Sequence, residues 1–369
     1  MTRVVHVRSA QGLYGAERSL LALAAATEPP FEPLVVSLVR PGREDALTAA
    51  AGRVGIAATR VDAPGRLSPS AVRPLLRLAR GGLLHAHDYK SLVLALVAGA
   101  LARIPVVATF HGDTGHLARV VVYERLARRA ARFTVAVAAT SGPLADAIRA
   151  AAPRTRVHVI PNGIAVRPPP TCSERDAARE LLGLPAGVPV VAFVGRLSKE
   201  KAPEVLLRAV HGTGLQLLVA GEGPLRRALE AEADPTQARF LGFLPDVGPV
   251  LAAADVLALP SRTEGLPMAV LEAMAAGVPV VASAVGSLPE VLGEGAGVLV
   301  PPGDIGALRD ALESLSRAEA RAPLASAALR RVESRYGAVA MARSYRDRLY
   351  QPALDSTRGR ARSPLVQTR

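Results

Sequence analysis

The sequence contains no tryptophan, a single cysteine and only 3% aromatic residues, and each shortage disfavours a class of protein. Proteins that hold single-stranded nucleic acid stack its bases on aromatic side chains, so a nucleic acid partner is disfavoured. The lone cysteine, Cys172, cannot form an internal disulfide or a multi-cysteine metal site. We interpret it as a linker residue without chemistry, in a protein of the reducing cytosol.

Long hydrophobic runs are also missing. The longest, Ser91–Ala102, is followed by Arg103 and falls short of the roughly 20 residues that cross a bilayer, so we predict a buried helix there. Residues 1–12 lack the apolar core of a targeting peptide. We therefore expect a cytoplasmic protein.

Acidic residues are scarce in the first half of the chain. Residues 1–167 contain 22 Lys and Arg against 10 Asp and Glu, and so carry +12 of the net charge of +13. One interpretation is an anionic partner: nucleic acid, a lipid-linked acceptor, or the inner face of the membrane. The other is a coding bias, because 42 of the 45 basic residues are arginine. Both stay open.

Two series of short apolar segments alternate with longer amphipathic segments along the chain. Strands that alternate with helices form parallel sheets covered on both faces, and 369 residues suffice for two such domains. We therefore predict an α/β fold of two Rossmann-like, doubly wound domains facing across a cleft. The predicted strands are Val4–Val7, Leu34–Val39, Gly82–His85, Val106–Phe110, Phe133–Val137, Val157–Ile160, Pro189–Val194, Leu215–Ala220, Ala238–Leu241, Val256–Leu259, Val278–Ala282 and Gly297–Val300.

Composition also predicts where the domains begin and end. We assign residues 1–167 to the first domain and residues 189–335 to the second. Residues 168–188, which begin with a run of three prolines, form the linker and the start of the second domain, with a helix predicted at Ala177–Leu182. Residues 336–354 form a helix that could cross back to the first domain, and the basic tail 355–369 is expected to be disordered.

The segment 260–277 carries the strongest functional signal. It is predicted as a strand end, a polar loop and a helix that opens at Pro267 and stops at Gly277. Glu264 lies in the loop and Glu272 in the helix. Free N–H groups at a helix start suit a phosphate, and carboxylates beside them accept hydrogen bonds from sugar hydroxyls. The combination indicates a nucleotide-sugar site.

Three further segments follow predicted strands of the second domain. In residues 193–201, Gly195 permits a turn, while Arg196 and Lys201 have the reach and charge to bind a pyrophosphate. The chain has only three lysines, and two lie here, which favours a need for a compact cation. A solvated cationic turn is the alternative.

The other two segments carry weaker signals. Gly221 and Gly223 permit close approach of a ligand to the backbone, although such turns are common without one. Residues 240–246, with Phe243 and Leu244, have backbone groups that could meet a base edge, or form an ordinary loop.

In the first domain, Gly12 and Gly15 leave room near a helix start. The segment does not match the dinucleotide fingerprint, so a nicotinamide cofactor is disfavoured, and no P-loop sequence occurs. His111 follows a strand and would reach the cleft, where it could bond a sugar hydroxyl or carry a proton. His85 and His87 lack a clear third ligand, so a metal site is disfavoured.

Together these segments resemble a known family. GRLSKEK (195–201), GEGPL (221–225), EGLPMAVLE (264–272) and VIPNGI (159–164) are similar to the retaining glycosyltransferases of the GT-B fold, family 4 (group 1). TFHG at His111 and GAE at Gly15 support the first domain. The resemblance spans nearly all of residues 4–304. It implies that residues 1–167 are an acceptor-binding domain and residues 189–335 a nucleotide-sugar-binding domain.

The resemblance implies transfer of a sugar from a nucleotide diphosphate sugar to an acceptor with retained configuration, without a metal or other cofactor. The resemblance does not specify the acceptor. The basic charge of the first domain favours an anionic one, which could be a lipid-linked, phospholipid or polysaccharide intermediate. The implied donor-binding residues are Gly195, Arg196, Lys201, Gly221, Gly223, Phe243, Leu244, Glu264, Gly265, Leu266, Pro267 and Glu272. The implied catalytic residues are His111 and Glu264, and Gly12 and Gly15 would shape the acceptor or phosphate side.

Two positions depart from the family pattern: Ala202 stands where Gly often follows the phosphate lysine, and Gly286-Ser287 stands where Gly-Gly is common. Two rival functions also remain. A nucleotide-sugar epimerase on the same fold would bind the same donor without an acceptor. A catalytically degenerate, basic binding protein would need only the charge of the first domain.

Overall fold

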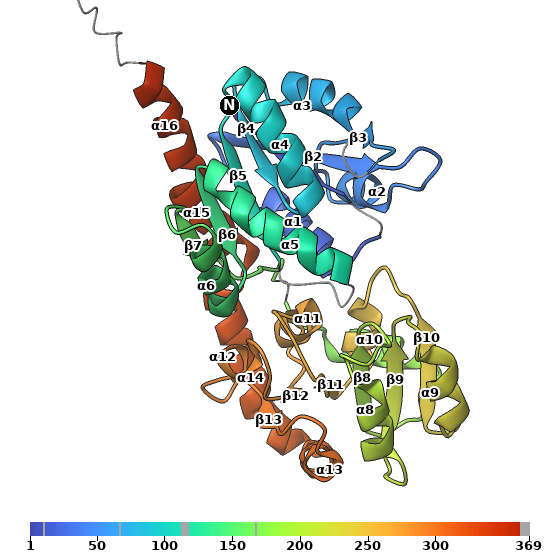
Figure 1. Ribbon diagram of the computed structural model, residues 1–369. Helices are drawn as coiled ribbons and strands as arrows, with labels where there is room; N and C mark the ends of the chain where they lie inside the picture. The colour runs from blue at the N-terminus through green and yellow to red at the C-terminus, as the bar shows by residue number, and fades with distance from the viewer. Residues whose placement is uncertain (10–11, 66–67, 112–117, 167, 362–369) are drawn as a thin grey trace, which may run out of the picture. The chain divides into compact units, whose positions relative to one another are not determined.

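The computed structural model describes residues 1–9, 12–65, 68–111, 118–166 and 168–361 (Figure 1). The chain divides into two compact units, each described here by itself. Unit 1 comprises Met1–Ala165 and Ala338–Arg369, and unit 2 comprises Val166–Gly337.

Unit 1 is built on a seven-stranded parallel sheet with the order β3-β2-β1-β4-β5-β6-β7. Its strands are β1 (Thr2–Arg8), β2 (Phe31–Val39), β3 (Ala58–Asp62), β4 (Leu83–Ala86), β5 (Val106–Phe110), β6 (Ala136–Ala139) and β7 (Val157–Val159). Its helical segments are α1 (Gly15–Ala25), α2 (Ala46–Arg53), η1 (Pro69–Ala71), α3 (Val72–Leu78), α4 (Tyr89–Ala102), α5 (Ala118–Ala130), η2 (Ala131–Phe133), α6 (Gly142–Ala151), α15 (Ala338–Tyr345), η3 (Arg346–Tyr350) and α16 (Gln351–Ala361).

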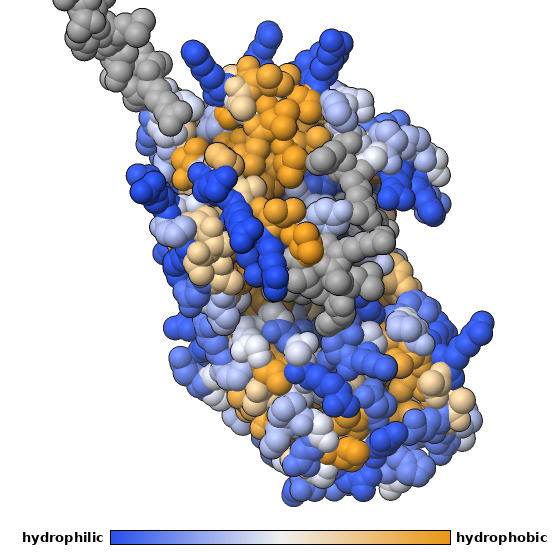
Figure 2. All heavy atoms as spheres, in the orientation of Figure 1, coloured by the Kyte–Doolittle hydropathy of each residue, from blue (hydrophilic) through white to orange (hydrophobic). Residues whose placement is uncertain are grey.

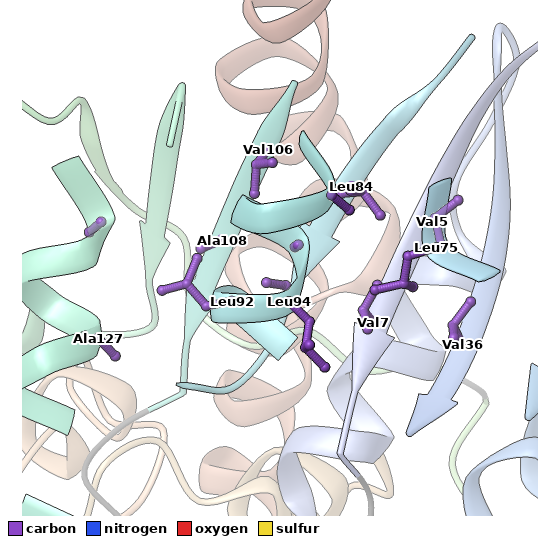
Figure 3. Close-up of a cluster of buried hydrophobic side chains, with 14 of the residues drawn as sticks. Val5, Val7, Val36, Leu75, Leu84, Leu92, Leu94, Val106, Ala108 and Ala127 are labelled. Atoms are coloured by element: carbon purple, nitrogen blue, oxygen red, sulfur yellow. The ribbon is translucent and has the colours of Figure 1, made fainter. Parts of the chain in front are cut away.

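The sheet of unit 1 is apolar on both faces, as helices on each side require. On one face, Val5, Val7 and Leu84 pack with Leu75 of α3 and Leu92 of α4 (Figure 3). The opposite face packs against α1 and the C-terminal helices in a second core. The continuous apolar strands of the sequence are thus explained by burial from two sides.

The C-terminal helices belong to this second core. Tyr345, Leu349, Tyr350 and Ala353 are buried in it together with residues of β1, β4 and β5. These contacts carry the helical backbone on to Ala361. The expected disorder from residue 355 is therefore not found for residues 355–361, because Ala353 and its neighbours anchor α16; residues 362–369 lie outside the described residues.

Unit 2 is built on a six-stranded parallel sheet with the order β10-β9-β8-β11-β12-β13. Its strands are β8 (Val190–Val194), β9 (Gln216–Ala220), β10 (Ala238–Gly242), β11 (Val256–Leu259), β12 (Val280–Ser283) and β13 (Val298–Val300). Its helices are α7 (Cys172–Leu181), α8 (Pro203–Val210), α9 (Arg226–Glu232), α10 (Gly248–Ala253), α11 (Met268–Ala275), α12 (Leu288–Val291), α13 (Ile305–Ser314) and α14 (Ala318–Arg335).

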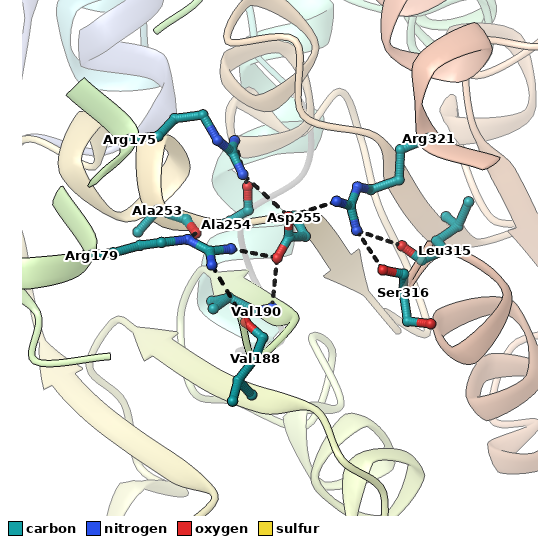
Figure 4. A network of polar contacts seen from close by, with 10 residues as sticks. All are labelled: Arg175, Arg179, Val188, Val190, Ala253, Ala254, Asp255, Leu315, Ser316 and Arg321. Atoms are coloured by element: carbon teal, nitrogen blue, oxygen red, sulfur yellow. Dashed lines mark hydrogen bonds and ion pairs between the residues drawn. The ribbon is translucent and has the colours of Figure 1, made fainter. Parts of the chain in front are cut away.

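A buried carboxylate joins several elements of unit 2. Asp255, 6% exposed, precedes β11 and accepts from Arg175 (3.1 Å) and Arg179 (2.5 Å) of α7 and from Arg321 of α14 at 3.0 Å (Figure 4). It also accepts from the backbone N–H of Val190 at 2.9 Å. One side chain thus ties β8 and β11 to two helices.

Four local predictions need correction. The strand predicted at Phe133–Val137 begins only at Ala136, as β6, because Ala131–Phe133 form the 3-10 helix η2. Helix α7 begins at Cys172, earlier than expected, because Thr171 and Glu174 form a capping box, so Cys172 lies exposed in a helix rather than in a linker. Pro267 is the N-cap of α11, with ψ of 121°, and not its first helical residue. Strand β3 and helices α2 and α3 are not among the predicted elements.

Candidate active site

The strand order of unit 2 reverses between β8 and β11, which are neighbours in the sheet but not in the sequence. In open parallel sheets, ligands bind outside the carboxyl ends of the strands at such a point. The loop after β8 carries Lys201 and the loop after β11 carries Glu264. A backbone hydrogen bond of 2.8 Å from Arg262 N to Glu200 O joins the two loops. The two segments with the clearest donor-binding signal therefore meet here.

Lys201 and Glu264 form an ion pair at this point. The lysine Nζ lies 2.6 Å and 2.7 Å from the two carboxylate oxygens. The Ser261 hydroxyl donates to Glu264 Oε1 at 2.6 Å. The Glu264 side chain is 5% exposed and that of Lys201 is 22% exposed. Glu264 is thus held in one place, and the cation predicted for the pyrophosphate touches the carboxylate predicted for the sugar.

The loop after β12 packs against the backbone of the loop that carries Glu264. Gly286 has φ of +58°, and a Cβ at this position would lie 1.9 Å from the Glu264 carbonyl oxygen. The Ser287 hydroxyl donates to the carbonyl of Gly265. Of the Gly286-Ser287 pair that departs from the family pattern, the glycine is required by close packing and the serine adds a hydrogen bond to the donor loop.

Gly221 and Gly223 meet the protein's own backbone. A Cβ on Gly221 would lie 1.8 Å from the carbonyl oxygen of Gly195, and one on Gly223 would lie 2.3 Å from that of Leu197. Leu197 N donates to Glu222 O at 2.9 Å, which holds the loops after β8 and β9 together. The space that a side chain at Gly221 or Gly223 would need is thus occupied by the backbone of the loop after β8. Contact of these glycines with a donor stays a prediction.

The remaining donor residues surround these loops. Arg196 is exposed and Glu272 of α11 is half-buried, and both have interactions within the protein. Gly265 is exposed, Leu266 is half-buried and Pro267 is buried at the start of α11. Their individual roles stay predictions.

The loop after β10 places an apolar side chain in solvent. Phe243 is 50% exposed, and Leu244 next to it is half-buried. Exposed large apolar side chains occur singly on any surface, so this observation is compatible with a base contact but does not require one.

Ala202 takes up a backbone conformation that favours glycine. It caps α8 with φ of 48° and ψ of 45°, in the left-handed region, and is fully buried. The glycine that family members often have here is thus explained by the turn between Lys201 and α8. In this chain the alanine methyl is accommodated in the interior.

The corresponding edge of unit 1 lies between β1 and β4, where its strand order reverses. Arg8 donates to Glu17 at 2.8 Å and to the carbonyl of His87. Glu17 is 2% exposed and accepts from the Tyr14 N–H at 3.0 Å, which fixes the start of α1. This loop includes the predicted residues Gly12 and Gly15. Gly15 is the first residue of α1, and a Cβ on Gly12 would lie 2.8 Å from the Tyr14 ring.

Beside this edge, the rings of His6, His87 and His111 form a hydrogen-bonded chain that ends at His111. His6 Nδ1 lies 3.1 Å from His87 Nε2, and His87 Nδ1 lies 3.2 Å from His111 Nε2. A fourth, His85, packs against His87 with ring centroids 4.0 Å apart and ring planes tilted by 36°. Its two nitrogens are bonded elsewhere, Nδ1 to the Tyr350 hydroxyl at 3.0 Å and Nε2 to Thr109 at 2.7 Å.

Burial keeps these imidazoles neutral. It lowers the pKa of His6 to about 3 and, with the positive charge of Arg8, that of His111 to about 3 as well; a contact with Asn162 opposes the latter shift. Burial and the neighbouring histidines also lower the pKa values of His85 and His87. His111 is therefore not a cationic group at neutral pH.

The cluster bears on the question of a metal. His6 is the third histidine that the sequence did not reveal, and one nitrogen each of His6, His85 and His87 lie within 4.8 Å of one another. Most of these nitrogens already bond to each other or to hydroxyl groups. The Arg8 guanidinium nearby further disfavours a cation. The absence of a metal site stays a prediction.

Comparison with known proteins places the chain. The model of the glycosyl transferases group 1 matches residues 188–318, and that of glycosyltransferase family 4 matches residues 14–167. The 2-deoxystreptamine N-acetyl-D-glucosaminyltransferase of Streptomyces fradiae is 34% identical over 300 residues, which cover 73% of this chain and 71% of that protein. The chain belongs to glycosyltransferase family 4. It is a glycosyltransferase, as the resemblance predicted.

Other relatives of this glycosyltransferase align over shorter lengths. The D-inositol 3-phosphate glycosyltransferase of Mycolicibacterium smegmatis is 41% identical over 193 residues, 48% of this chain and 44% of that protein. The chain thus aligns with less than half of that relative.

Solved structures confirm the fold of the glycosyltransferase. Anabaena HepE in complex with UDP and glucose gives a TM-score of 0.81 at 23% identity and covers 95% of this chain and 100% of its own. Sucrose-phosphate synthase from Thermosynechococcus elongatus gives 0.74 at 20% identity, covering 96% and 100%. With two parallel sheets, these likenesses confirm the GT-B fold class.

Proposed function

We propose that this glycosyltransferase moves a sugar from a nucleotide diphosphate sugar to an acceptor with retention of anomeric configuration. The observation that carries the proposal is the pairing of Lys201 with Glu264 where the strand order of unit 2 reverses. Lysine has three donors, so Nζ can keep a bond to Glu264 while it meets a phosphate oxygen. Structures of Anabaena HepE with UDP and UDP-glucose support the choice of donor class.

The chemistry follows from where charge develops. As the glycosidic bond breaks, negative charge grows on the β-phosphate, and Arg196, Lys201 and the free N–H groups before α11 are suited to stabilise it. Glu264 accepts hydrogen bonds from sugar hydroxyls and Glu272 from the ribose. His111, neutral and in the other unit, is assigned to the vicinity of the reacting carbon.

No residue is assigned as a covalent nucleophile. The acceptor hydroxyl then attacks from the face that the leaving phosphate occupies, and a phosphate oxygen takes its proton. This front-face course retains the configuration without a covalent intermediate. It agrees with a His111 that is neutral at neutral pH.

The donor is tested by thermal shift with UDP-, GDP-, ADP- and dTDP-sugars on the wild type and on Glu272→Ala. We expect one nucleotide to stabilise the wild type and the variant to bind it about 1–3 kcal/mol more weakly, the scale of a hydrogen bond to a charged group. Glu319→Ala, in α14, is the control. A well-folded wild type that none of the four stabilises would argue for a degenerate site.

The reaction is tested by product analysis. NMR of the product with the identified donor should show the anomeric configuration of the donor sugar. Incubation without any acceptor distinguishes the epimerase, which would convert the donor sugar alone. Inverted configuration would overturn the retaining course, and conversion of the donor alone would overturn transfer.

For the acceptor we propose an anionic molecule, either a lipid-linked or polysaccharide intermediate or a phosphorylated ring. The names of two relatives specify 2-deoxystreptamine and D-inositol 3-phosphate, of which the second is phosphorylated. The excess of basic residues in residues 1–167 supports an anion. A panel that pairs each alcohol with its phosphorylated form tests this: equal rates for both members of every pair would overturn it.

We further propose that unit 1 associates with an anionic membrane surface through α4. The outer side of this helix is apolar and open, with Val97 44% and Leu101 69% exposed. Figure 2 shows hydrophobic side chains gathered over α4, with hydrophilic ones around them. Exposed arginines lie on both neighbouring helical segments and after α4: Arg73, Arg77, Arg80, Arg103, Arg125, Arg129 and Arg132.

The positive charge around the apolar side of α4 favours binding to an anionic membrane surface over a neutral one. Residues 72–133 contain ten Lys and Arg against three Asp and Glu. Each basic residue near an anionic bilayer contributes about 1 kcal/mol, screened by salt. Among the described residues no helix combines the length and the apolar character needed to cross a membrane.

Sedimentation with vesicles tests the association. Binding to vesicles with 30% anionic lipid should exceed binding to neutral vesicles, fall with salt, and weaken in Leu101→Glu. Leu181→Glu, in the exposed part of α7, is the matched control because Leu181 is 77% exposed in unit 2. Equal loss in both variants, or binding that ignores lipid charge, would count against the proposal.

A further inference from the structure

The chain of three histidines begins in the interior of unit 1 and ends at His111. His6, in the central strand β1, is 0% exposed, and His87, directly after β4, is 2% exposed. Each ring contacts the next through nitrogens 3.1 Å and 3.2 Å apart. The backbone of His87 is fixed as well: its N–H donates to Val7 O at 3.1 Å, and its carbonyl accepts from Arg8. The middle ring therefore has a defined place.

Each end of this chain is a nitrogen without a hydrogen bond in the described part of the protein, and the Asn162 side chain lies near the His111 end. His6 Nε2 and His111 Nδ1 are buried nitrogens without a hydrogen-bond partner among the described residues. Three neutral imidazoles carry three N–H protons, and each of the two ring-to-ring bonds uses one of them. The third proton must lie at one end, on His6 Nε2 or on His111 Nδ1. The tautomer of His111 is thus coupled to that of His6 through His87.

We propose that His87, backed by His6, is a positioning residue for His111. It holds Nε2 of His111, so that Nδ1 is the atom left to meet the donor sugar. The proposal rests on the proposed function for the identity of that ligand. A ligand oxygen that accepts from Nδ1 favours the arrangement in which the third proton lies on His111 Nδ1 and His6 Nε2 is bare. To reach it, each of the two bridging protons shifts to the nitrogen across its hydrogen bond, one proton leaves His6 Nε2 for water, and one is taken up from water at His111 Nδ1, so the net charge does not change.

The charges around the chain favour the neutral form. Arg8 lies near His87 and His111 and is paired with Glu17 at 2.8 Å, while the tilted ring of His85 packs against His87. An added proton on His87 or His111 would meet the positive charge of Arg8, and an added proton on any of the three rings would lie in a buried site. The chain is consequently suited to orient a neutral imidazole and not to deliver a charge.

His85 provides a matched control within the same cluster. It is as buried as His87 and contacts its ring, yet its nitrogens bond to Tyr350 and Thr109 and not to the chain. A structural role of buried histidines in general would make His85 and His87 equally important. A positioning role makes only His87 important for His111.

The first test reads tautomers and needs no substrate. Full-length protein labelled with ¹⁵N-histidine gives two-bond ¹H–¹⁵N spectra in which protonated and bare nitrogens differ. His111 should show a single defined tautomer in the wild type and in His85→Asn, and a mixture of tautomers in His87→Leu. Addition of the nucleotide sugar found by thermal shift should move the proton toward Nδ1. A mixture in the wild type, or no change in His87→Leu, would overturn the proposal.

The second test uses the reaction. His87→Leu should lower kcat about 10–100-fold with little change in the KM for the donor, as loss of an orienting partner does. His87→Asn, whose amide can replace Nδ1, should recover part of kcat, and His85→Asn should keep it. In a His111→Ala background, His87→Leu should cause no further loss. Additive losses would overturn the proposal.

These results separate the two proposals. Absence of transfer with every donor would refute the proposed function, while the tautomer spectra would still support or refute the chain. If His87→Leu does not fold, His6→Asn, which removes the far ring and leaves His87 bonded to His111, is expected to loosen the tautomer of His111. Zinc bound in equal amount to the purified protein would show that His6, His85 and His87 coordinate a metal instead.

Discussion

Lys201 Nζ contacts both carboxylate oxygens of Glu264, at 2.6 Å and 2.7 Å, and thereby ties the loop after β8 to the loop after β11. Removal of one partner would leave the other charge in a site where Glu264 is only 5% exposed. Lys201→Met is therefore expected to lower the free energy of unfolding of unit 2 by about 3 kcal/mol. Hydrogen exchange of amides in β8 and β11 measures this.

The double variant Lys201→Met/Glu264→Gln should recover part of that loss, because no unpaired charge remains. Arg208→Met is the control, since Arg208 pairs with Glu232 in solvent, with the two side chains 57% and 44% exposed, and should change stability much less. A double variant less stable than Lys201→Met would contradict the ion-pair argument.

Gly286→Ala is expected to disturb the Glu264 loop more than backbone strain alone can explain. Its Cβ would lie 1.9 Å from Glu264 O, whereas Gly295, with φ of +76°, has nothing within 4 Å. Gly295→Ala should cost about 1–2 kcal/mol, the penalty of the left-handed region. Gly286→Ala should cost more and also weaken UDP binding in calorimetry. Equal costs with unchanged UDP affinity would show that the loop adapts.

The fold could be predicted because its strands are short apolar runs between amphipathic helices. β3 is the exception, since Ala58–Asp62 has one buried residue, Val61, and lies at the sheet edge. The start of α7 depended on a cap in which Thr171 and Glu174 act together, which a search for apolar period does not detect. Buried strands and helices have a periodic pattern of apolar residues that the sequence reveals, whereas helix caps and edge strands have only a weak pattern.

The candidate site was predictable to the level of loops. The rule that ligands bind at strand ends brought out Lys201, Glu264 and His111. The histidine chain was missed because His6 and His87 become neighbours of His111 only once β1, β4 and β5 are placed side by side. Reading the histidines at the ends of these strands against the usual order of a doubly wound sheet would have found it.

Asp255→Asn is expected to destabilise unit 2 strongly. The carboxylate accepts from three arginines and one backbone N–H, and an amide keeps the shape but removes the charge and one acceptor atom. The expected loss is about 3 kcal/mol, measured by hydrogen exchange of β8 and β11 amides. Asp310→Asn, exposed on α13, is the control and should stay within about 0.5 kcal/mol of the wild type. Similar losses in both variants would mean that water can replace the Asp255 carboxylate as the acceptor of the arginine hydrogen bonds.

The stability of unit 1 is expected to fall as the pH is lowered below 6.5. Burial lowers the pKa of His6 from 6.5 to about 3, so between these values the unfolded chain binds a proton that the folded chain does not. Unfolding is therefore favoured as pH falls, and above pH 6.5 this contribution is constant. From pH 7.5 to 5.0 each such histidine should cost about 2 kcal/mol, and His85 and His87 shift in the same direction. Denaturation followed by tyrosine fluorescence measures it, since five of the six tyrosines lie in unit 1. His6→Asn should show a shallower pH dependence than the wild type; the same slope in both would mean that His6 takes up its proton in the folded state.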